Sequence, residues 1–448
     1  MVIFNPISCY TVNPTKASKV ATPPNDYVIN PPDESTESLW LSFKNINMPQ
    51  KRNGQSRKNS VDSSKPIYFS NDNAEAFHDA KVIFENHLKE GVFQYNNQPS
   101  IYVYVIEWPG WKQVGIIGQI AVEDWKNGKC KPNENVLLKN VEEIVKSTII
   151  QKIYTGFPVL FGDFHADLSK LVDEAIAKHT PFISLEFDNA RHSLYRLSEA
   201  ESLEVSILLK SLDCLYLADG HHRSRGYLEV VDVLNQNKDK LTSKSNPDWY
   251  SIPSMVFNTK CMQVLRFNRV LPSLLGWEED DLIKRLSDYF DFSQREAPKL
   301  KELLGSTTDL EMSFDKMLVP AGKGTFAFYF CKSDRWFWAK SKGPFTPNPM
   351  EKLDAHYLST YFFTQTLGIN DLSRSEYVKY MPETSGSTFA QAVHCIEEDM
   401  AMLIVCPSAT IEDIKEVSNL GLFMPPKSTL FYPKPLLGLI IKDLPSRN

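Results

Sequence analysis

The chain has 448 residues, of which 42% are hydrophobic and 12% aromatic, and it carries a formal net charge of -6. This is the composition of a folded globular protein, and the length predicts two or three lobes. The acidic balance argues against a general nucleic-acid binder, which would carry a basic excess, but it allows a locally positive pocket for a small anionic substrate.

The seven cysteines are dispersed, with no Cys-x-x-Cys pair and no metal-like pairing with histidine. Such a set is typical of buried thiols in a reducing compartment. The first residues lack the basic start and long apolar core of a signal peptide, and no apolar run is long enough to span a bilayer. We therefore expect a cytoplasmic protein with no membrane partner.

The first part of the chain combines strands, proline-locked loops and one polar insertion. Alternating apolar residues predict a strand over 2–12, and prolines hold the backbone of 23–32 in a non-helical path. Residues 44–66 are basic and polar with almost nothing apolar, which is typical of a mobile loop. A helix over 73–91 and strands over 101–106 and 114–122 follow.

Helical and strand-like patterns then alternate, which predicts an α/β fold with a mixed sheet. The predicted helices or amphipathic segments are 136–152, 168–177, 199–209, 224–234, 278–305, 353–367 and 411–420. The predicted strands are 157–161, 182–187, 212–217, 251–257, 262–267, 325–331, 335–339 and 402–405, and 389–395 is ambiguous. We expect an N-terminal α/β lobe over 1–125, a core over 126–270 and a C-terminal α/β lobe over 271–448.

The run Asp219-Gly220-His221-His222-Arg223 joins a predicted buried strand to a predicted helix. A glycine there lets the backbone turn tightly, and the first N–H groups of the helix attract anions. Two imidazoles and a guanidinium add donors or positive charge at the same place. We interpret the turn as a phosphate cradle with an acid at its edge. A surface or core-edge feature is the alternative interpretation.

A second polar motif lies near the C-terminus, where prolines flank Lys427-Ser428-Thr429 and also Lys434. Two ammonium groups and two hydroxyls on a proline-held backbone suit phosphate binding. Composition alone, however, favours a tightly packed C-terminal tail.

Several standard nucleotide and metal motifs are absent from the sequence. It contains no Gly-x-x-x-x-Gly-Lys-Ser/Thr loop, no kinase-type His-Arg-Asp loop and no Gly-x-Gly-x-x-Gly turn. It also lacks His-Glu-x-x-His, the signature of many zinc hydrolases.

Four motifs together resemble those of the pyrophosphate-dependent serine kinases, long an uncharacterised domain family. They are Ala218-Asp219-Gly220-His221-His222-Arg223, Met424-Pro425-Pro426-Lys427-Ser428-Thr429, Pro23-Pro24 with Asp26, and Arg191-His192. The resemblance extends from about Pro6 to Leu439. It implies a core similar to that of the free-serine kinases of the ParB and sulfiredoxin superfamily, with additional N- and C-terminal lobes.

The chain departs from this family in three motifs. Asn25 stands where the family has tyrosine, Asn133-Glu134 replaces a His-Glu turn, and Phe267-Asn268-Arg269 replaces Thr-His-Arg. The basic 44–66 loop resembles an insertion.

The resemblance implies phosphoryl transfer from pyrophosphate to the hydroxyl of free L-serine, with Mg2+, giving O-phosphoserine, a precursor in cysteine biosynthesis, and phosphate. Such a reaction requires charge neutralisation on the donor, in-line placement of the acceptor and a group that takes its proton. We expect Glu134 to be the base, with Asp219 as the second candidate and as the residue that organises magnesium or orients a histidine. The expected phosphate-binding residues are Gly220, His221, His222, Arg223, Arg269, Lys427, Ser428, Thr429 and Lys434.

The serine molecule itself is expected to bind near 186–192. Arg191 and His192 are candidates for its carboxylate or a phosphate, and Glu186 or Asp188 for its ammonium group. An ion pair that fixes a loop is the alternative role for these residues.

Two other functions remain open from the sequence. A kinase that uses ATP or ADP would need a nucleotide pocket in addition to the phosphate cradle. A non-catalytic ParB-like protein would bind a partner, and the acidic net charge argues against DNA as that partner.

Overall fold

The computed structural model describes residues 1–22, 74–235, 250–297, 299–303, 308–320, 322–372, 376–384 and 387–444. The Pro23-Pro24-Asp26 motif and the 44–66 loop lie outside these residues, so the expectations for them stay predictions.

The chain folds as two compact units, each with its own core. Unit 1 consists of Met1–Pro132, Val136–Met262 and Pro433–Asn448, and unit 2 consists of Asn133–Asn135 and Gln263–Tyr432. The chain therefore leaves unit 1 twice, first for the three residues around Glu134 and then for Gln263–Tyr432, and its C-terminal segment returns to unit 1. The predicted division into three lobes stays a prediction.

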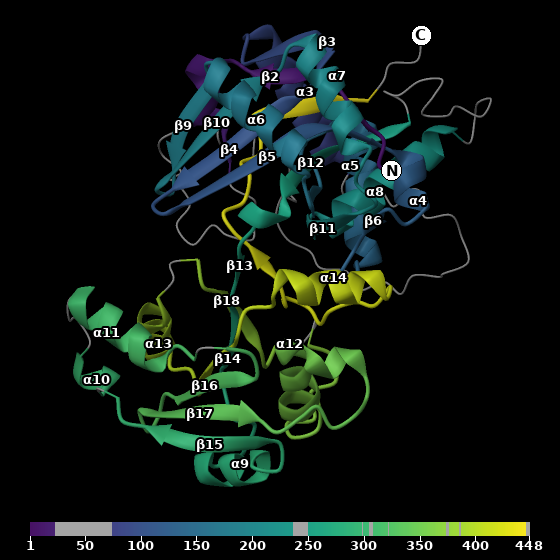
Figure 1. The fold of residues 1–448 in the computed structure, drawn as a ribbon. Coiled ribbons are helices and arrows are strands. Elements are labelled where there is room, and N and C mark those ends of the chain that lie inside the picture. Colours follow the sequence, from purple (N-terminus) through teal and green to yellow (C-terminus); the bar gives the residue numbers. More distant parts are fainter. Residues whose placement is uncertain are drawn as a thin grey trace. The chain divides into compact units, whose positions relative to one another are not determined.

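Unit 1 is built on a mixed sheet (Figure 1). The strand order is β6 (Cys130–Lys131), β11 (Leu215–Asp219), β8 (Val159–Gly162), β12 (Ser251–Asn258), β5 (Trp111–Ala121), β4 (Tyr102–Trp108), β10 (Ala190–Arg196) and β9 (Ile183–Phe187), with β1 (Phe4–Asn5) paired to β5. The pairs β6–β11 and β8–β12 are parallel, and the other neighbours are antiparallel. This arrangement confirms the predicted α/β fold with a mixed sheet.

A smaller sheet joins the two ends of the chain within unit 1. Its order is β3 (Phe93–Ser100), β2 (Ile7–Val12), β21 (Ile440–Asp443) and β7 (Ile153–Tyr154). The C-terminal strand is thus held between β2 and β7.

The helices of unit 1 include two that pack against each other next to the Asp219–Arg223 turn. They are α1 (Ala17–Val20), α3 (Ala74–Lys89), α4 (Val122–Lys126), α5 (Leu138–Gln151), α6 (Ala166–Lys178), α7 (Glu199–Leu209) and α8 (His221–Asn235), with 3-10 turns at Pro14–Lys16 and Thr259–Cys261. Val141 and Val145 of α5 form a buried cluster with Val230 of α8. This contact holds the helix that begins at the turn.

Unit 2 contains an antiparallel sheet with helices on both faces. The order is β15 (Phe290–Arg295), β17 (Arg335–Ser341), β16 (Thr325–Phe330), β19 (Met402–Val405), β14 (Phe267–Leu271) and β18 (Lys379–Pro382), and β13 (Val264–Leu265) pairs with β20 (Leu430–Phe431). The helices are α9 (Glu279–Leu286), α10 (Leu300–Leu303), α11 (Thr308–Leu318), α12 (Asp354–Tyr357), α13 (Thr388–Glu397) and α14 (Ile411–Asn419), with a 3-10 turn at Pro349–Lys352 and a π-helical stretch at Leu358–Thr364.

Strand β16 shows how the period of two in the sequence builds this layered unit. Phe326 and Phe328 pack in a core that includes α9 and the π-helical stretch. Ala327 and Tyr329 point to the other face, in a core with α10, α11 and α13. Both faces of the strand are therefore buried, which explains its continuous run of apolar residues.

The prediction of one helix over 278–305 is wrong in its middle. Residues Phe290–Arg295 form β15, whose partner is β17. Phe290 and Phe292 alternate with Asp291 and Ser293, and this period of two fits a sheet edge. Pairing with β17 decides the conformation of this segment.

The stretch 389–395, which is ambiguous from the sequence, lies within the helix α13.

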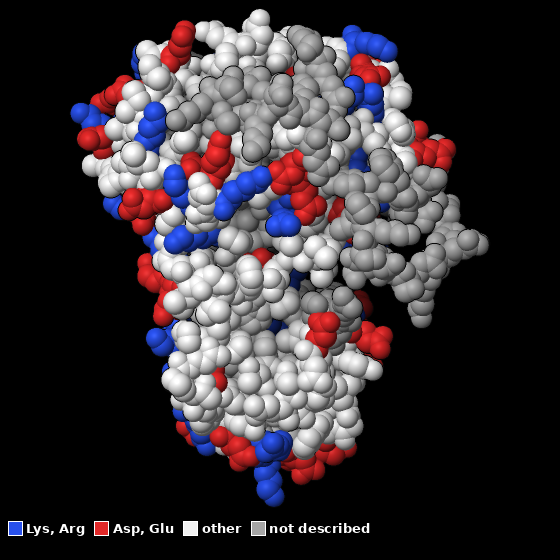
Figure 2. Space-filling view, turned by 90° about the vertical axis from the view of Figure 1, so that its right-hand side faces the viewer, with Lys and Arg blue, Asp and Glu red and all other residues white. Residues whose placement is uncertain are grey.

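Charged side chains on the face drawn in Figure 2 are of both signs and interspersed. None of the helices in the described ranges combines the length and the apolar content needed to cross a membrane.

Candidate active site

The turn between β11 and α8 has the geometry expected of a tight strand-to-helix connection. Asp219 ends the strand, Gly220 has a φ of +85°, and His221 begins the helix. A Cβ atom at position 220 would lie 3.2 Å from the Cα atom of Pro158. Both the positive φ and the close backbone of Pro158 therefore favour glycine here.

Two cations converge on the carboxylate of Asp219. The Lys434 Nζ atom contacts one carboxylate oxygen, and the Arg223 Nη1 atom lies 3.8 Å from the other. The side chain of Lys434 is 9% exposed, and those of Asp219 and Arg223 are 21% and 26% exposed. The cluster therefore lies at the edge of the interior, where electrostatic interactions are stronger than on an open surface.

The charge on this cluster follows from these contacts. Burial alone would raise the pKa of Asp219, but the neighbouring Lys434 and Arg223 outweigh it and hold the pKa below its ordinary value. Asp219 is therefore ionised near neutral pH, and with two cations the triad carries one net positive charge. The N-terminus of α8 adds partial positive charge at the same place.

The sequence predicted that both Lys434 and the Asp219–Arg223 turn bind phosphate, and the structure brings them together across 215 residues. The return of the C-terminal segment to unit 1 makes this contact possible. Sequence reasoning placed these residues in different lobes, because nothing in the local pattern shows where the last strand pairs.

Gly156 shapes the space beside Arg223, and sequence reasoning missed it. A Cβ atom at position 156 would lie 3.0 Å from Cζ of Arg223 and 3.2 Å from Cδ2 of Leu437. Its carbonyl oxygen accepts a hydrogen bond of 2.7 Å from the Tyr227 hydroxyl, which comes from the second turn of α8. Gly156 therefore lets the guanidinium pack closely and ties α8 to the preceding loop.

The two histidines of the turn differ in their surroundings, and their phosphate-binding roles stay predictions. His221 is buried, and burial lowers its pKa to about 4, although Asp219 opposes this shift. It is therefore neutral near pH 7 and adds no positive charge. The Nε2 atom of His222 accepts a hydrogen bond of 3.0 Å from the backbone N–H of Leu137, at the start of α5.

The residues predicted to bind serine do not converge. Glu186 and Arg191 are paired across β9 and β10 and form an exposed ion pair of 2.8 Å. Asp188 lies at the hairpin turn with a φ of +48°. His192 is buried on the opposite side of its strand, where its Nδ1 atom lies 2.8 Å from the Tyr104 hydroxyl. Their serine-binding roles stay predictions, and these contacts favour the alternative, structural role.

Glu134 and the Met424–Thr429 motif meet in unit 2. The Thr429 hydroxyl donates a hydrogen bond of 3.0 Å to Glu134 across 295 residues. The neighbouring Asn133 is fully buried, and its carbonyl oxygen accepts a bond of 2.8 Å from the N–H of Met424. The predicted base and the predicted phosphate-binding hydroxyl of Thr429 therefore belong to one cluster.

Arg269 joins the same cluster through backbone contacts. It is 3% exposed in β14, and it donates to the carbonyl oxygens of Phe267 and, at 3.2 Å, Lys427. Its guanidinium also lies over the ring of Tyr380, 5.2 Å from the centroid. These contacts hold the left-handed backbone of Lys427, whose φ is +55°. Ser428 donates a bond of 2.6 Å to the carbonyl oxygen of Pro425.

The described residues do not fit a magnesium ion held by the protein alone. Within the ranges that the structure describes, no three His, Cys, Asp or Glu side chains are grouped to hold a metal. The two oxygens of Asp219 face Lys434 and Arg223. Magnesium typically uses one or two carboxylates together with substrate phosphates and water. The metal role of Asp219 stays a prediction.

Several solved structures align with the chain at low similarity. A free serine kinase in complex with AMP is 12% identical with a TM-score of 0.33, and the alignment covers 70% of this chain and 86% of that one. SbnI with a C-terminal truncation, from Staphylococcus aureus, is 10% identical with a TM-score of 0.37, and the alignment covers 73% and 87%. A conserved hypothetical protein from Pyrococcus furiosus is 13% identical with a TM-score of 0.32, and the alignment covers 73% and 95%. No curated protein matches the chain in sequence.

Residues 4–356 match the model of a family described as "Protein of unknown function (DUF1015)". The match includes Glu134, the Asp219–Arg223 turn and Arg269. It ends before the Met424–Thr429 motif and Lys434.

Proposed function

The chain belongs to the DUF1015 family, and on that premise we propose that it is a phosphotransferase that moves a phosphoryl group from inorganic pyrophosphate to the hydroxyl of free L-serine. The products are O-phosphoserine and phosphate. The proposal is supported by the resemblance of its motifs to those of the pyrophosphate-dependent serine kinases and by the cation cluster at the start of α8.

The observation that carries the proposal is the convergence of Lys434 and Arg223 at the N-terminus of α8. An ammonium and a guanidinium that are mostly removed from water attract an oxyanion more strongly than exposed cations do. Asp219 holds the two cations in place and neutralises one of their charges while the site is empty. A pyrophosphate oxygen can then interact with the remaining donors and with the first N–H groups of the helix.

The reaction places few chemical demands on the protein. A new bond forms between the serine oxygen and one phosphorus, and the bridging P–O bond of pyrophosphate breaks. The serine hydroxyl loses its proton, and we assign this proton to Glu134, with Asp219 as the second candidate. Arg269, Lys427, Ser428 and Thr429 are assigned to the leaving phosphate on the resemblance alone.

Magnesium enters this proposal as part of the substrate, magnesium pyrophosphate. The ion neutralises phosphate charge when bound. The residues of this chain then need to supply only cationic and N–H donors, which agrees with the predominance of such groups around Asp219.

The first experiment measures O-phosphoserine formation and phosphate release from L-serine and magnesium, with pyrophosphate, ATP or ADP as donor in parallel. We expect turnover with pyrophosphate. Turnover only with a nucleotide would identify the ATP- or ADP-dependent kinase instead. The absence of turnover with every donor, together with salt-sensitive binding to DNA, would identify the ParB-like binding protein.

Variants then test the named residues. Lys434→Met is expected to lower kcat/KM for pyrophosphate by about 100-fold or more, because a cation of the proposed pyrophosphate site is lost. The matched control is Lys126→Met, which removes another Lys–Asp pair of unit 1, one that is 42% and 49% exposed. We expect this control to change kcat/KM by less than about twofold.

Glu134→Ala and His222→Ala are expected to lose activity while remaining folded. For Glu134→Ala the loss should appear mainly in kcat, because a proton acceptor acts in the transition state. Full activity in folded Glu134→Ala would contradict its assignment as the base. Full activity in folded His222→Ala would contradict its predicted role in phosphate binding.

A further inference from the structure

Lys434 lies between two residues that cannot donate backbone hydrogen bonds. Pro433 and Pro435 have no N–H group, and each fixes its own φ angle. The backbone on the C-terminal side of Lys434 is therefore first anchored at Leu436, whose N–H donates a bond of 3.0 Å to the Tyr104 hydroxyl. Leu437 follows, paired with Thr22 through bonds of 2.8 and 3.1 Å.

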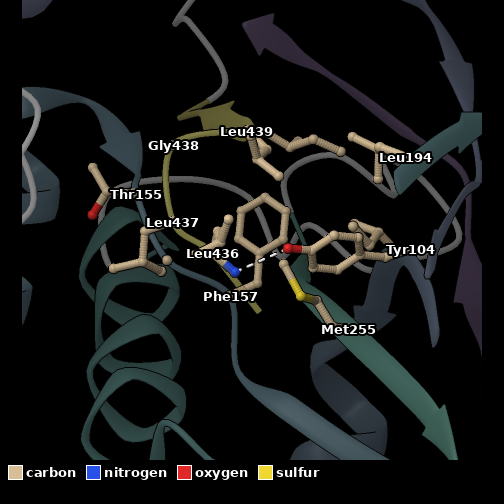
Figure 3. A pocket seen from close by; sticks show the side chains of 12 residues that line it. Tyr104, Thr155, Phe157, Leu194, Met255, Leu436, Leu437, Gly438 and Leu439 are labelled. Carbon is tan, nitrogen blue, oxygen red and sulfur yellow. Dashed lines mark hydrogen bonds between the residues drawn. The ribbon is translucent and has the colours of Figure 1, made fainter. Parts of the chain in front are cut away.

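The Tyr104 hydroxyl is itself held in place by His192. Figure 3 shows the Leu436 N–H directed at this hydroxyl within an apolar surrounding that includes Phe157 and Met255. The hydroxyl lies 2.8 Å from the Nδ1 atom of His192. Because its oxygen accepts from Leu436, its own proton is available for Nδ1 of His192.

The sheet register explains why these two side chains meet. Tyr104 is opposite Leu194, and His192 is opposite Ile106, so Tyr104 and His192 are diagonal neighbours on one face of β4 and β10. Tyr104 is 1% exposed and His192 is 2% exposed. Burial lowers the pKa of His192 to about 4, so the ring is neutral and Nδ1 can accept near pH 7.

We propose that Tyr104 and His192 are positioning residues that hold the C-terminal segment so that Lys434 remains on Asp219. The chain of contacts runs from His192 to Tyr104, to the N–H of Leu436, and through the rigid Pro435 to Lys434. His192, which the sequence suggested as a serine ligand, therefore acts on the site through another residue. The consequence for pyrophosphate binding rests on the proposed function, but the position of Lys434 does not.

The position of Lys434 is tested by its reactivity. The ε-amino group is little exposed and paired, so acetylation by a soluble reagent should be slow. In Tyr104→Phe, which keeps the ring and removes the hydroxyl, we expect the acetylation rate of Lys434, measured by peptide mass spectrometry, to rise about tenfold. His192→Leu, which removes the acceptor for this hydroxyl, should shift the rate in the same direction.

The matched control is Tyr102→Phe, on the same strand and the same face. Tyr102 is also fully buried, and its hydroxyl contacts Cys9 at 3.4 Å instead of the Lys434 segment. We expect this variant to leave Lys434 as protected as in the wild type. An unchanged Lys434 rate in folded Tyr104→Phe, or an equal rise in both variants, would overturn the proposal.

Two further measurements keep the test decisive. The first is hydrogen exchange. In the wild type, the Leu436 amide should exchange with solvent as slowly as that of Leu437, and rapid exchange would refute the proposal even if Tyr104→Phe does not fold.

The second measurement is a double-mutant cycle for pyrophosphate affinity. Tyr104→Phe should weaken binding about tenfold, or about 1.4 kcal/mol, and should have no further effect in a Lys434→Met background.

These results separate the two proposals. If the wild type does not bind pyrophosphate while Lys434 reactivity responds to Tyr104→Phe, the function is wrong and the positioning role is supported. If the wild type binds pyrophosphate and the effects of Tyr104→Phe and Lys434→Met simply add, the function stands and the positioning role is wrong.

Discussion

At the scale of single residues, the site is defined by which charges are buried together. Asp219 ends a strand, and its two oxygens face Lys434 and Arg223. Removing one member of such a group leaves an uncompensated charge, which costs more than the loss of an exposed pair. The carboxylate therefore helps to hold the two cations in place. His221 and His192, in contrast, are buried as neutral rings.

The two buried histidines predict a specific pH dependence. Each has a pKa of about 4 in the folded chain, below the ordinary value of 6.5. At these two rings the unfolded chain therefore binds more protons between these values, so their contribution to stability is full above about pH 6.5 and falls as the pH is lowered towards 4. We expect each ring to contribute on the order of 1.4 kcal/mol per pH unit within this window.

Urea unfolding at a series of pH values measures this effect. His192→Asn should flatten the dependence of the unfolding free energy on pH, because one of the two neutral rings is lost. His78→Asn changes an exposed histidine of α3 and leaves both buried rings in place, so it serves as the control. An unchanged slope in His192→Asn would show that His192 protonates equally well in both states.

At the scale of elements, two segments far apart in sequence form the cation cluster. The β11–α8 connection presents Asp219 and Arg223, and the segment before β21 presents Lys434. The first depends on a tight turn at Gly220, and the second depends on the pairing of β21 with β2 and β7. A substitution that displaces the turn or disrupts the pairing of β21 would therefore separate the charges without altering any charged residue.

The turn can be tested by comparing two glycines with positive φ. Gly220→Ala adds a methyl group 3.2 Å from the Pro158 Cα atom at a φ of +85°. Gly128→Ala adds one at a φ of +71° with no other atom within 4 Å. The control should lose about 1 kcal/mol of unfolding free energy through backbone strain alone. Gly220→Ala should lose more, because Pro158 must also move.

Urea unfolding provides the free energies, and pyrophosphate affinity provides the functional measure. We expect Gly128→Ala to keep wild-type affinity and Gly220→Ala to weaken it, because the first N–H groups of α8 are displaced. Equal losses of stability in the two variants would mean that Pro158 does not confine the turn.

At the scale of the whole molecule, the chain contains two units with separate cores. The cation cluster lies within unit 1, and the cluster of Glu134, Thr429 and Arg269 lies within unit 2. Chains with several units often deviate from two-state behaviour, so the free energies for the histidine and glycine variants refer to the unfolding of unit 1, which contains all of these residues. Local measurements are more informative.

Hydrogen exchange with and without pyrophosphate supplies such a measurement. A ligand that binds only the folded state stabilises it by about 2.7 kcal/mol at a concentration of 100 times Kd. We expect slower exchange in peptides that cover the start of α8 and the residues around Lys434. The β15–β17 hairpin of unit 2 serves as an internal reference. No change at α8 under saturating pyrophosphate would contradict the assigned binding site.

Part of this structure could be predicted from local patterns alone. The strand, glycine and helix around Asp219 follow from an apolar run, a flexible residue and helical spacing, and the structure confirms all three. The strand at 290–295 has a local period of two, but it lies between helical patterns, and only its pairing with β17 decides its conformation. The predicted strand over 262–267 ends before Arg269, but β14 buries Arg269 in mid-strand, where its donors bind carbonyl oxygens.

The sequence by itself determined the α/β character, the Asp219–Arg223 turn and the family resemblance, because these depend on residues that are neighbours in the chain. Only the tertiary structure decided that Lys434 meets Asp219, that Thr429 meets Glu134, and that His192 faces Tyr104. Each of these contacts joins residues at least 88 positions apart. They depend on strand pairing and burial over the whole chain, which no local pattern encodes.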